Sequence, residues 1–159
     1  MRLFNVFLGA PEGLELERRA FHEAVGESNQ AEGLPRGTLF VPLFTSRKIH
    51  EQEAIDSNIQ TSTYYLLALD DNWGPPGRSF EHDLHFALAC REDPTLPMRE
   101  VVVLVKKQAG DRPLDPGLSA FRNRAPGPSD PRRIEFDSPQ QFKTIVNELF
   151  RGWLRELAA

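Results

Sequence analysis

The chain has 159 residues, which is enough for one domain with a single sizeable hydrophobic core. Hydrophobic residues make up 40% and charged residues 26%, as in ordinary soluble globular proteins, and the net charge of −4 argues against general nucleic-acid binding. The single cysteine excludes an intramolecular disulfide and favours a reducing compartment, and the longest apolar runs are too short to cross a membrane. We expect one domain over residues 1–159, located in the cytoplasm, and the sequence leaves open that it is the N-terminal domain of a larger protein.

Strand and helix patterns alternate along the first part of the chain. Residues 3–8 form a nearly continuous apolar run, which is typical of a strand covered on both faces. Residues 14–29 carry an apolar stripe at helical spacing, and residues 38–44 predict a second strand. Pro42 cannot donate to a β-ladder, so this strand is expected at an edge of the sheet. A short helix is predicted over residues 50–60.

The same alternation continues in the second part. Residues 64–69 predict a third strand. A loop follows, and residues 80–90 then predict a helix. Residues 101–105 are the clearest central strand, and residues 132–136 alternate like a final edge strand. Between these two lies a segment rich in proline and glycine, residues 108–133, interpreted as a long loop with one helical turn near its middle.

The last predicted helix has the strongest start signal in the chain. Ser138 can cap it, Pro139 suits the first helical position, and Gln141 completes a capping box. Its apolar stripe consists of Phe142, Ile145, Val146, Leu149, Phe150, Trp153, Leu154 and Leu157.

Five strands alternating with helices imply right-handed crossovers, and therefore an α/β fold with a doubly wound, mostly parallel sheet and helices on both faces. For five strands the flavodoxin-like order 2-1-3-4-5 is the default. Ligands of such folds bind beyond the carboxyl ends of the first and third strands, where the strand order reverses. The loops expected there are residues 9–13 and 70–79.

Glu81 is the main candidate for a catalytic residue. Ser79 can act as an N-cap, which places Glu81 in the first turn of the helix that follows. Acidic residues at this position commonly do no more than offset the helix dipole. Beside Trp73 at the predicted crevice, however, a carboxylate could stabilise or attack an oxocarbenium-like centre. Trp73 would stack on a base, or anchor the loop with its indole half-buried.

Further residues near the same crevice are candidates for substrate binding. We expect Gly9, Ala10, Gly74 and Ser79 to line the pocket through their loops. Asp70 could bind ribose hydroxyls as an acceptor, or simply end the strand and shape the turn. Arg47 follows the second strand and could meet a phosphate, although a solvated loop residue is the commoner outcome.

The sequence lacks the better-known cofactor signatures. It contains no G-x-G-x-x-G fingerprint and no Walker motif. His82 and His85 lie three positions apart on one predicted helix, but without a second spaced pair we predict no metal site. Cys90 is expected to be a small core residue and not a nucleophile.

Three segments resemble the TIR-like domains of bacterial signalling and defence proteins. The first is VFLGAPEGLELERRAFHEAV, in which Glu17 and Arg18 match the family's E-R pair on the first helix. NIQTSTYYLLALDDNWGPP and SFEHDLHFALA are similar to the family's third strand, its W-G loop and the following helix with an early glutamate. The resemblance covers roughly residues 3–105 and rests on pattern.

The resemblance implies a function as well as a flavodoxin-like fold. TIR domains share this architecture with nucleoside deoxyribosyltransferases, and active members of both groups use a helix-start glutamate, matched here by Glu81, to cleave an N-glycosidic bond. We therefore expect an NAD glycohydrolase or a related nucleotide N-glycosidase in bacterial signalling or antiviral defence, with NAD as substrate and no resident cofactor. The expected partners are a small nucleotide and either a second copy of the chain or a larger defence protein, but neither nucleic acid nor a membrane. The alternatives are a non-catalytic adaptor module and a deoxyribosyltransferase-like enzyme.

Overall fold

The computed structural model describes residues 1–44, 52–74, 80–107 and 115–158. The strands are β1 (Arg2–Gly9), β2 (Thr38–Phe44), β3 (Tyr64–Leu69), β4 (Glu100–Lys106) and β5 (Arg132–Phe136). The α-helices are α1 (Glu15–Ser28), α2 (Gln52–Gln60), α3 (Phe80–Glu92), α4 (Pro116–Asn123) and α5 (Pro139–Ala158). None of the described helices is both long and apolar enough to cross a membrane.

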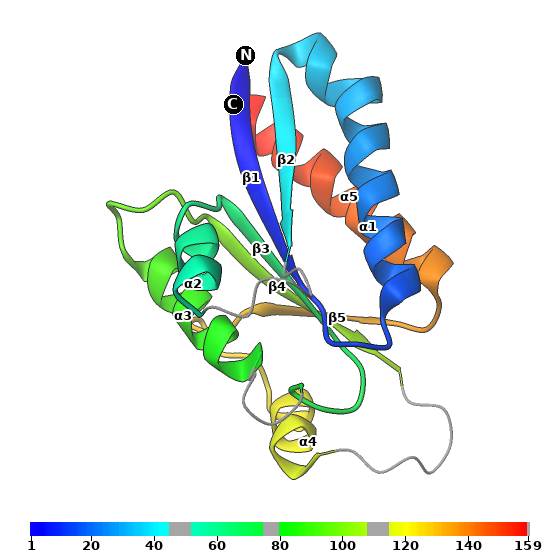
Figure 1. The fold of residues 1–159 in the computed structure, drawn as a ribbon, viewed down its shortest axis with the longest axis vertical. Helices are drawn as coiled ribbons and strands as arrows, with labels where there is room; N and C mark the ends of the chain where they lie inside the picture. The colour runs from blue at the N-terminus through cyan, green and yellow to red at the C-terminus, as the bar shows by residue number, and fades with distance from the viewer. Residues whose placement is uncertain (45–51, 75–79, 108–114, 159) are drawn as a thin grey trace.

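The five strands form one parallel sheet in the order β2-β1-β3-β4-β5, which confirms the predicted doubly wound α/β fold (Figure 1). β3 is buried along its whole length, as its uninterrupted apolar sequence indicated. β2 is an edge strand, as Pro42 predicted, because the outer side of an edge strand needs no ladder donor.

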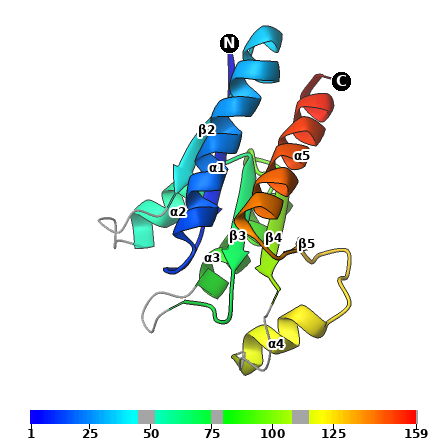
Figure 2. The same ribbon diagram turned by 90° about the vertical axis from the view of Figure 1, so that its right-hand side faces the viewer.

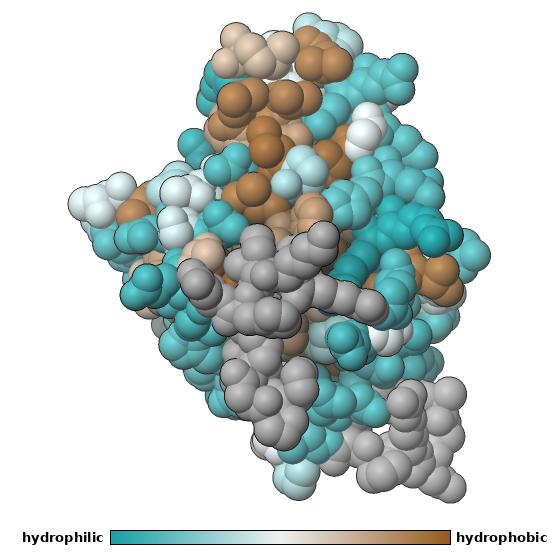
Figure 3. Space-filling model, in the orientation of Figure 1, coloured by the Kyte–Doolittle hydropathy of each residue, from teal (hydrophilic) through white to brown (hydrophobic). Residues whose placement is uncertain are grey.

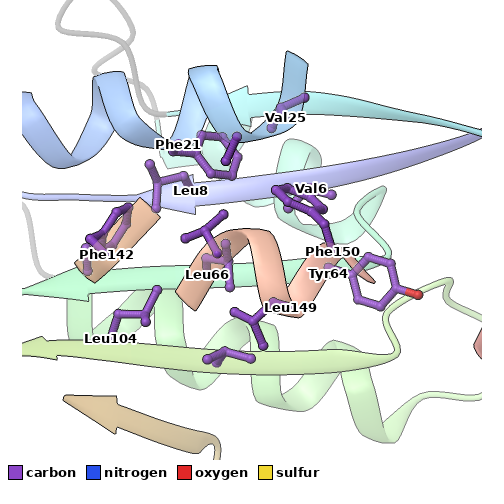
Figure 4. Close-up of a cluster of buried hydrophobic side chains, with 14 of the residues drawn as sticks. Val6, Leu8, Phe21, Val25, Tyr64, Leu66, Leu104, Phe142, Leu149 and Phe150 are labelled. Carbon is purple, nitrogen blue, oxygen red and sulfur yellow. The ribbon is translucent and has the colours of Figure 1, made fainter. Parts of the chain in front are cut away.

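Two helical layers cover the sheet. α1 and α5 lie side by side on one face (Figure 2), and α2 and α3 cover the other (Figure 1). Alternate residues of the strands face the two layers, so Val6 and Leu8 of β1 point into the α1–α5 core whereas Phe7 points into the α2–α3 core. Figure 4 shows the first of these cores, with Phe21 beside Leu8 of β1 and with Leu66 of β3 facing the same core.

α5 begins with the predicted cap. The backbone N–H of Gln141 donates to Oγ of Ser138 at 3.1 Å, and the Gln141 side chain accepts from the backbone N–H of Asp137 at 2.6 Å. Further along the helix, the Trp153 ring stacks on Tyr64 with centroids 3.9 Å apart, and its Nε1 donates to Glu100 at 2.8 Å. These contacts attach α5 to the amino ends of β3 and β4.

The described part of the proline- and glycine-rich segment, residues 115–133, is more helical than the sequence suggested. It contains the two-turn helix α4, where a single turn was predicted. Asp115 caps this helix, with its Oδ2 accepting from the backbone N–H of Leu118 at 3.1 Å. The backbone N–H of Asp115 donates to the carbonyl of Asp71 at 3.1 Å, and Arg122 donates to the carbonyl of Lys106 at 3.1 Å. α4 is thereby held beyond the carboxyl ends of β3 and β4 (Figure 1).

Candidate functional site

An open hollow of about 460 Å³ lies between α3 and α4, next to the loop that follows β3. The residues that line it are Trp73, Glu81, Leu84, His85, Leu88, Gly117, Ala120, Phe121, Arg124, Ser129, Asp130 and Pro131. The two residues on which the sequence hypothesis depends, Glu81 and Trp73, therefore border one hollow.

Glu81 lies in the first turn of α3, as predicted, and its side chain is 48% exposed. One turn later on the same helix, Nε2 of His85 lies 3.7 Å from the Glu81 carboxylate. A carboxylate in the first turn also offsets the positive end of the helix dipole. Glu81 is thus a solvent-accessible carboxylate on the wall of the hollow, with an imidazole beside it.

Trp73 anchors the loop. Its backbone carbonyl accepts from the N–H of Phe80 at 2.9 Å, which attaches the loop to the start of α3. Its ring packs edge-to-face on Phe121 of α4, with centroids 5.3 Å apart. Its Nε1 is buried without a hydrogen-bond partner among the described residues, and a Cβ added to Gly117 would come within 3.7 Å of it. The indole therefore acts as an anchor and also forms part of the wall of the hollow.

Asp70 and Gly74 belong to the framework of the same loop. Gly74 has a φ of 109°, which L side chains rarely adopt, and its N–H donates to Oδ1 of Asn72 at 2.7 Å. The carbonyl of Asp70 lies 3.5 Å from the guanidinium of Arg122. Neither Asp70 nor Gly74 lines the hollow as the described residues form it.

Gly9 and Ala10 lie at the end of β1, buried beneath other side chains. A Cβ added to Gly9 would lie 3.2 Å from Leu67 and 3.4 Å from Phe80. The carbonyl of Ala10 accepts a hydrogen bond from Arg18. The structure thus does not bring these two residues to the wall of the hollow that Glu81 borders. The other two predicted binding residues, Arg47 and Ser79, lie outside the described residues.

Two groups of side chains that include a buried acid were not predicted. Glu17 of α1 is 2% exposed, and its carboxylate lies 3.4 Å from Nζ of Lys106 at the end of β4. The sequence matched Glu17 to the E-R pair of TIR-like domains but could not identify its partner on a strand so distant along the chain.

The second unpredicted group lies between α2 and α3. Asp83 is fully buried, and Nε2 of Gln52 donates to it at 3.0 Å and to Asp56 at 2.8 Å. Nε2 of His82 lies 3.9 Å from Asp56. His82 and His85 are three positions apart on α3, but their ring nitrogens lie near different carboxylates, that of Asp56 on α2 for His82 and that of Glu81 for His85.

Cys90 is a core residue. It is 3% exposed, and burial raises the pKa of its thiol, with the charges of Asp93 and Asp56 adding to the effect. A raised pKa keeps the thiol protonated at neutral pH, so Cys90 is not activated as a nucleophile.

A larger open hollow, of about 670 Å³, lies at the other end of the sheet, between α5 and the starts of β4 and β5. Its rim carries charges of both signs, including Arg132 and Glu100, which form an ion pair at 3.4 Å. Such mixed, paired charges provide no local excess that would select a charged ligand.

No protein-family model matches the chain. The comparison with curated proteins also finds no match.

Solved structures share the fold. The flavodoxin-like domain of a Synechococcus protein matches with a TM-score of 0.51 and 13% identity, over 94% of this chain and 99% of that one. Rubredoxin oxygen:oxidoreductase from the anaerobe Desulfovibrio gigas matches with a TM-score of 0.55 and 11% identity, over 100% of this chain and 38% of that one. A flavodiiron core from a Synechocystis species has a TM-score of 0.50 and 14% identity, over 97% of this chain and 36% of that one. These similarities establish a flavodoxin-like fold.

Proposed function

We propose that the chain is a TIR-like nucleotide N-glycosidase, with NAD as its leading substrate and Glu81 as its catalytic carboxylate. The observation that carries the proposal is that Glu81 and Trp73 border one hollow beyond the end of β3. A flavodoxin-like sheet binds its ligands beyond the carboxyl ends of its strands. The resemblance of residues 3–105 to TIR-like domains supports the same assignment.

In this mechanism the glycosidic bond between C1′ and the base nitrogen breaks, and its electron pair leaves with the base. Nicotinamide departs as a neutral molecule, so the positive charge passes to the ribose ring. Glu81 stabilises the resulting oxocarbenium-like centre or bonds to it, and water then adds its oxygen to C1′ and releases a proton. Nε2 of His85 lies 3.7 Å from the Glu81 carboxylate, on the same helix, and is close enough to orient it.

The nucleotide's phosphates require a cation, and Arg124 is the arginine in the lining of this hollow. Its guanidinium is 2.7 Å from the carboxylate of Asp130, and its side chain is 60% exposed. An exposed pair of this kind is weak, so a diphosphate can compete with Asp130 for the guanidinium. The proposed site therefore combines a carboxylate for the sugar, an indole at the wall and an arginine for the phosphates.

The decisive experiment measures nicotinamide release from NAD at high protein concentration, comparing the unchanged chain with Glu81→Gln and Glu92→Gln. Glu81→Gln keeps the shape of the side chain and removes its charge, so we expect turnover to fall by about 10²-fold or more. Glu92 is 70% exposed and ends the same helix, which makes Glu92→Gln the matched control with unchanged turnover. Absence of turnover in the unchanged chain, or equal turnover in Glu81→Gln, would refute the proposal.

Base exchange separates hydrolysis from deoxyribosyl transfer, which would use the same carboxylate. A deoxyribosyltransferase would incorporate a labelled free nucleobase into a deoxynucleoside, whereas a glycohydrolase passes the sugar to water. We expect nicotinamide release without incorporation of the label.

A second candidate function is a non-catalytic interaction module. It is favoured by apolar side chains left exposed at the N-terminal ends of β1 and β2, where Met1 is 74% and Leu3 61% exposed. Figure 3 shows hydrophobic residues gathered over this part of the sheet. Exposed apolar patches often mark interaction surfaces. For such a module, Leu3→Lys would abolish association with a partner in sedimentation or pull-down experiments, and Glu81→Gln would have no effect.

A further inference from the structure

We propose that Gln52, Asp56, His82 and Asp83 form a binding site for a divalent transition-metal ion, such as Zn²⁺, between α2 and α3. This site is separate from the hollow bordered by Glu81 and does not rest on the proposed glycosidase activity. Its role would be to fasten the two helices together at the start of α3.

The donor atoms already lie close together. One oxygen each from Asp56 and Asp83 and one ring nitrogen of His82 lie within 4.8 Å of one another. Zinc bonds to histidine nitrogen and carboxylate oxygen are about 2.0–2.2 Å long, which places tetrahedral ligand atoms roughly 3.3 Å apart. Nε2 of His82 and Oδ1 of Asp56 are 3.9 Å apart, so small rotations of these two partly exposed side chains bring them to binding distance.

Gln52 shows how the site is held together. The single Nε2 of its amide donates to carboxylate oxygens of both Asp56 and Asp83, at 2.8 Å and 3.0 Å. Two carboxylates held this close repel each other, and a neutral amide balances their charge only in part. A divalent cation between them would neutralise both. A half-turn of the amide would then direct its oxygen to the ion as a fourth donor.

The local sequence explains why the four side chains meet. Gln52 and Asp56 are four positions apart, so they lie on the same side of α2. His82 and Asp83 are consecutive in the first turn of α3, and Asp83 is fully buried between the helices. A rigid buried carboxylate with more mobile ligands around it suits metal capture, because only the outer ligands need to adjust.

The donor types indicate the class of metal. An imidazole together with carboxylate and amide oxygens suits Zn²⁺ and similar first-row ions, whereas Mg²⁺ and Ca²⁺ prefer oxygen ligands alone.

The test is a titration of the full chain, first stripped with EDTA, with ZnCl₂ in isothermal calorimetry. Thermal unfolding is followed in parallel. We expect one saturable site with micromolar or tighter affinity and an increase in Tm of several degrees, since an ion that binds only the folded state stabilises it. Cobalt(II) should give a visible absorption band if an ordered nitrogen–oxygen site forms.

The variants are chosen so that folding does not confuse the result. Asp56→Asn and His82→Ala alter partly exposed side chains. Each should weaken Zn²⁺ binding by at least about tenfold, since even the loss of a group that only orients a metal ligand costs roughly 10–100-fold. His85→Ala removes the neighbouring histidine, 71% exposed and outside the donor set, and should bind normally. The proposal is overturned if the unchanged chain shows no saturable Zn²⁺ binding in the calorimeter. It is also overturned if all three variants bind Zn²⁺ with equal affinity.

Discussion

The two helical layers differ in what they bury. The α1–α5 layer encloses an aromatic core in which Phe40, Phe150 and Trp153 contact one another, and Phe40 and Trp153 also contact Tyr64. Its buried acid, Glu17, pairs with Lys106. The α2–α3 layer has a smaller apolar cluster that borders an open hollow on one side and includes the buried Asp83.

The contrast indicates a division across the sheet: the aromatic packing that stabilises the fold lies on one face, and both proposed sites lie on or beside the other. The aromatic packing lies behind β1 and β3, and its rings line neither the hollow bordered by Glu81 nor the proposed metal site. Both candidate sites involve α3, whose flanks carry polar groups and a hollow instead of a continuous apolar contact. The predictions below test this division, beginning with the largest expected effect.

Truncation of one phenylalanine in each layer tests the division directly. Phe150 is fully buried within the aromatic core, so we expect Phe150→Ala to lower the free energy of unfolding by about 3–5 kcal/mol. Phe80→Ala, at the start of α3, should cost about 1 kcal/mol less, because Phe80 lies in the first turn of its helix and keeps 4% of its surface exposed. Urea denaturation measures both. A larger loss from Phe80→Ala would reverse the comparison.

The pH dependence of stability examines the aromatic core from another side. Burial raises the pKa of Tyr64 to about 12, against the opposing charge of Arg99. The unfolded chain releases the phenolic proton near pH 10, while the folded chain keeps it. The protonated phenol of Tyr64 therefore contributes fully to the free energy of unfolding below pH 10, and this contribution is lost as the pH rises through about 12. We expect a loss of roughly 2 kcal/mol over this range.

Tyr64→Phe is the control for this prediction. It removes the phenol and should flatten the change in unfolding free energy between pH 9 and 11.5, a window chosen to span roughly the ordinary tyrosine pKa. An unchanged slope in the variant would show that other groups control alkaline stability.

The cap of α5 provides the smallest and most local test. Ser138→Ala removes the acceptor for the backbone N–H of Gln141, and we expect a loss of about 1 kcal/mol. Ser138→Asp restores an acceptor and should recover most of that stability in the same denaturation experiment. Failure of the aspartate to recover it would indicate that the hydroxyl has a role other than capping.

Much of the fold could be predicted because its signals are local. Apolar periodicity located the strands and helices, and alternation of the two kinds of element indicated a parallel sheet with helices on both faces. Pro42 indicated an edge strand through its missing N–H, and Ser138 and Gln141 marked the start of α5. α4 was underestimated because proline and glycine dominate its surroundings, although Asp115 and Pro116 form a recognisable cap and first position.

The candidate sites were predicted less completely because they depend on contacts between distant segments. The sequence placed Glu81 at a helix start and Trp73 in the preceding loop, and the structure puts both on one hollow. The same topology placed Gly9 and Ala10 nearby, but the side chain of Phe80 lies against Gly9. Which side chain covers a strand end is a matter of packing, and no local pattern encodes it.

By itself, the sequence determined the order and type of the elements, the edge position of β2 and the helix-start position of Glu81, because backbone hydrogen bonding and apolar burial act over a few residues. Only the tertiary structure decided that α4 closes one side of the hollow, that Glu17 meets Lys106, and that His82 of α3 lies near Asp56 of α2. The reason is physical: each of these contacts joins groups on different elements, so its distance follows from how the helices pack on the sheet and not from spacing along the chain.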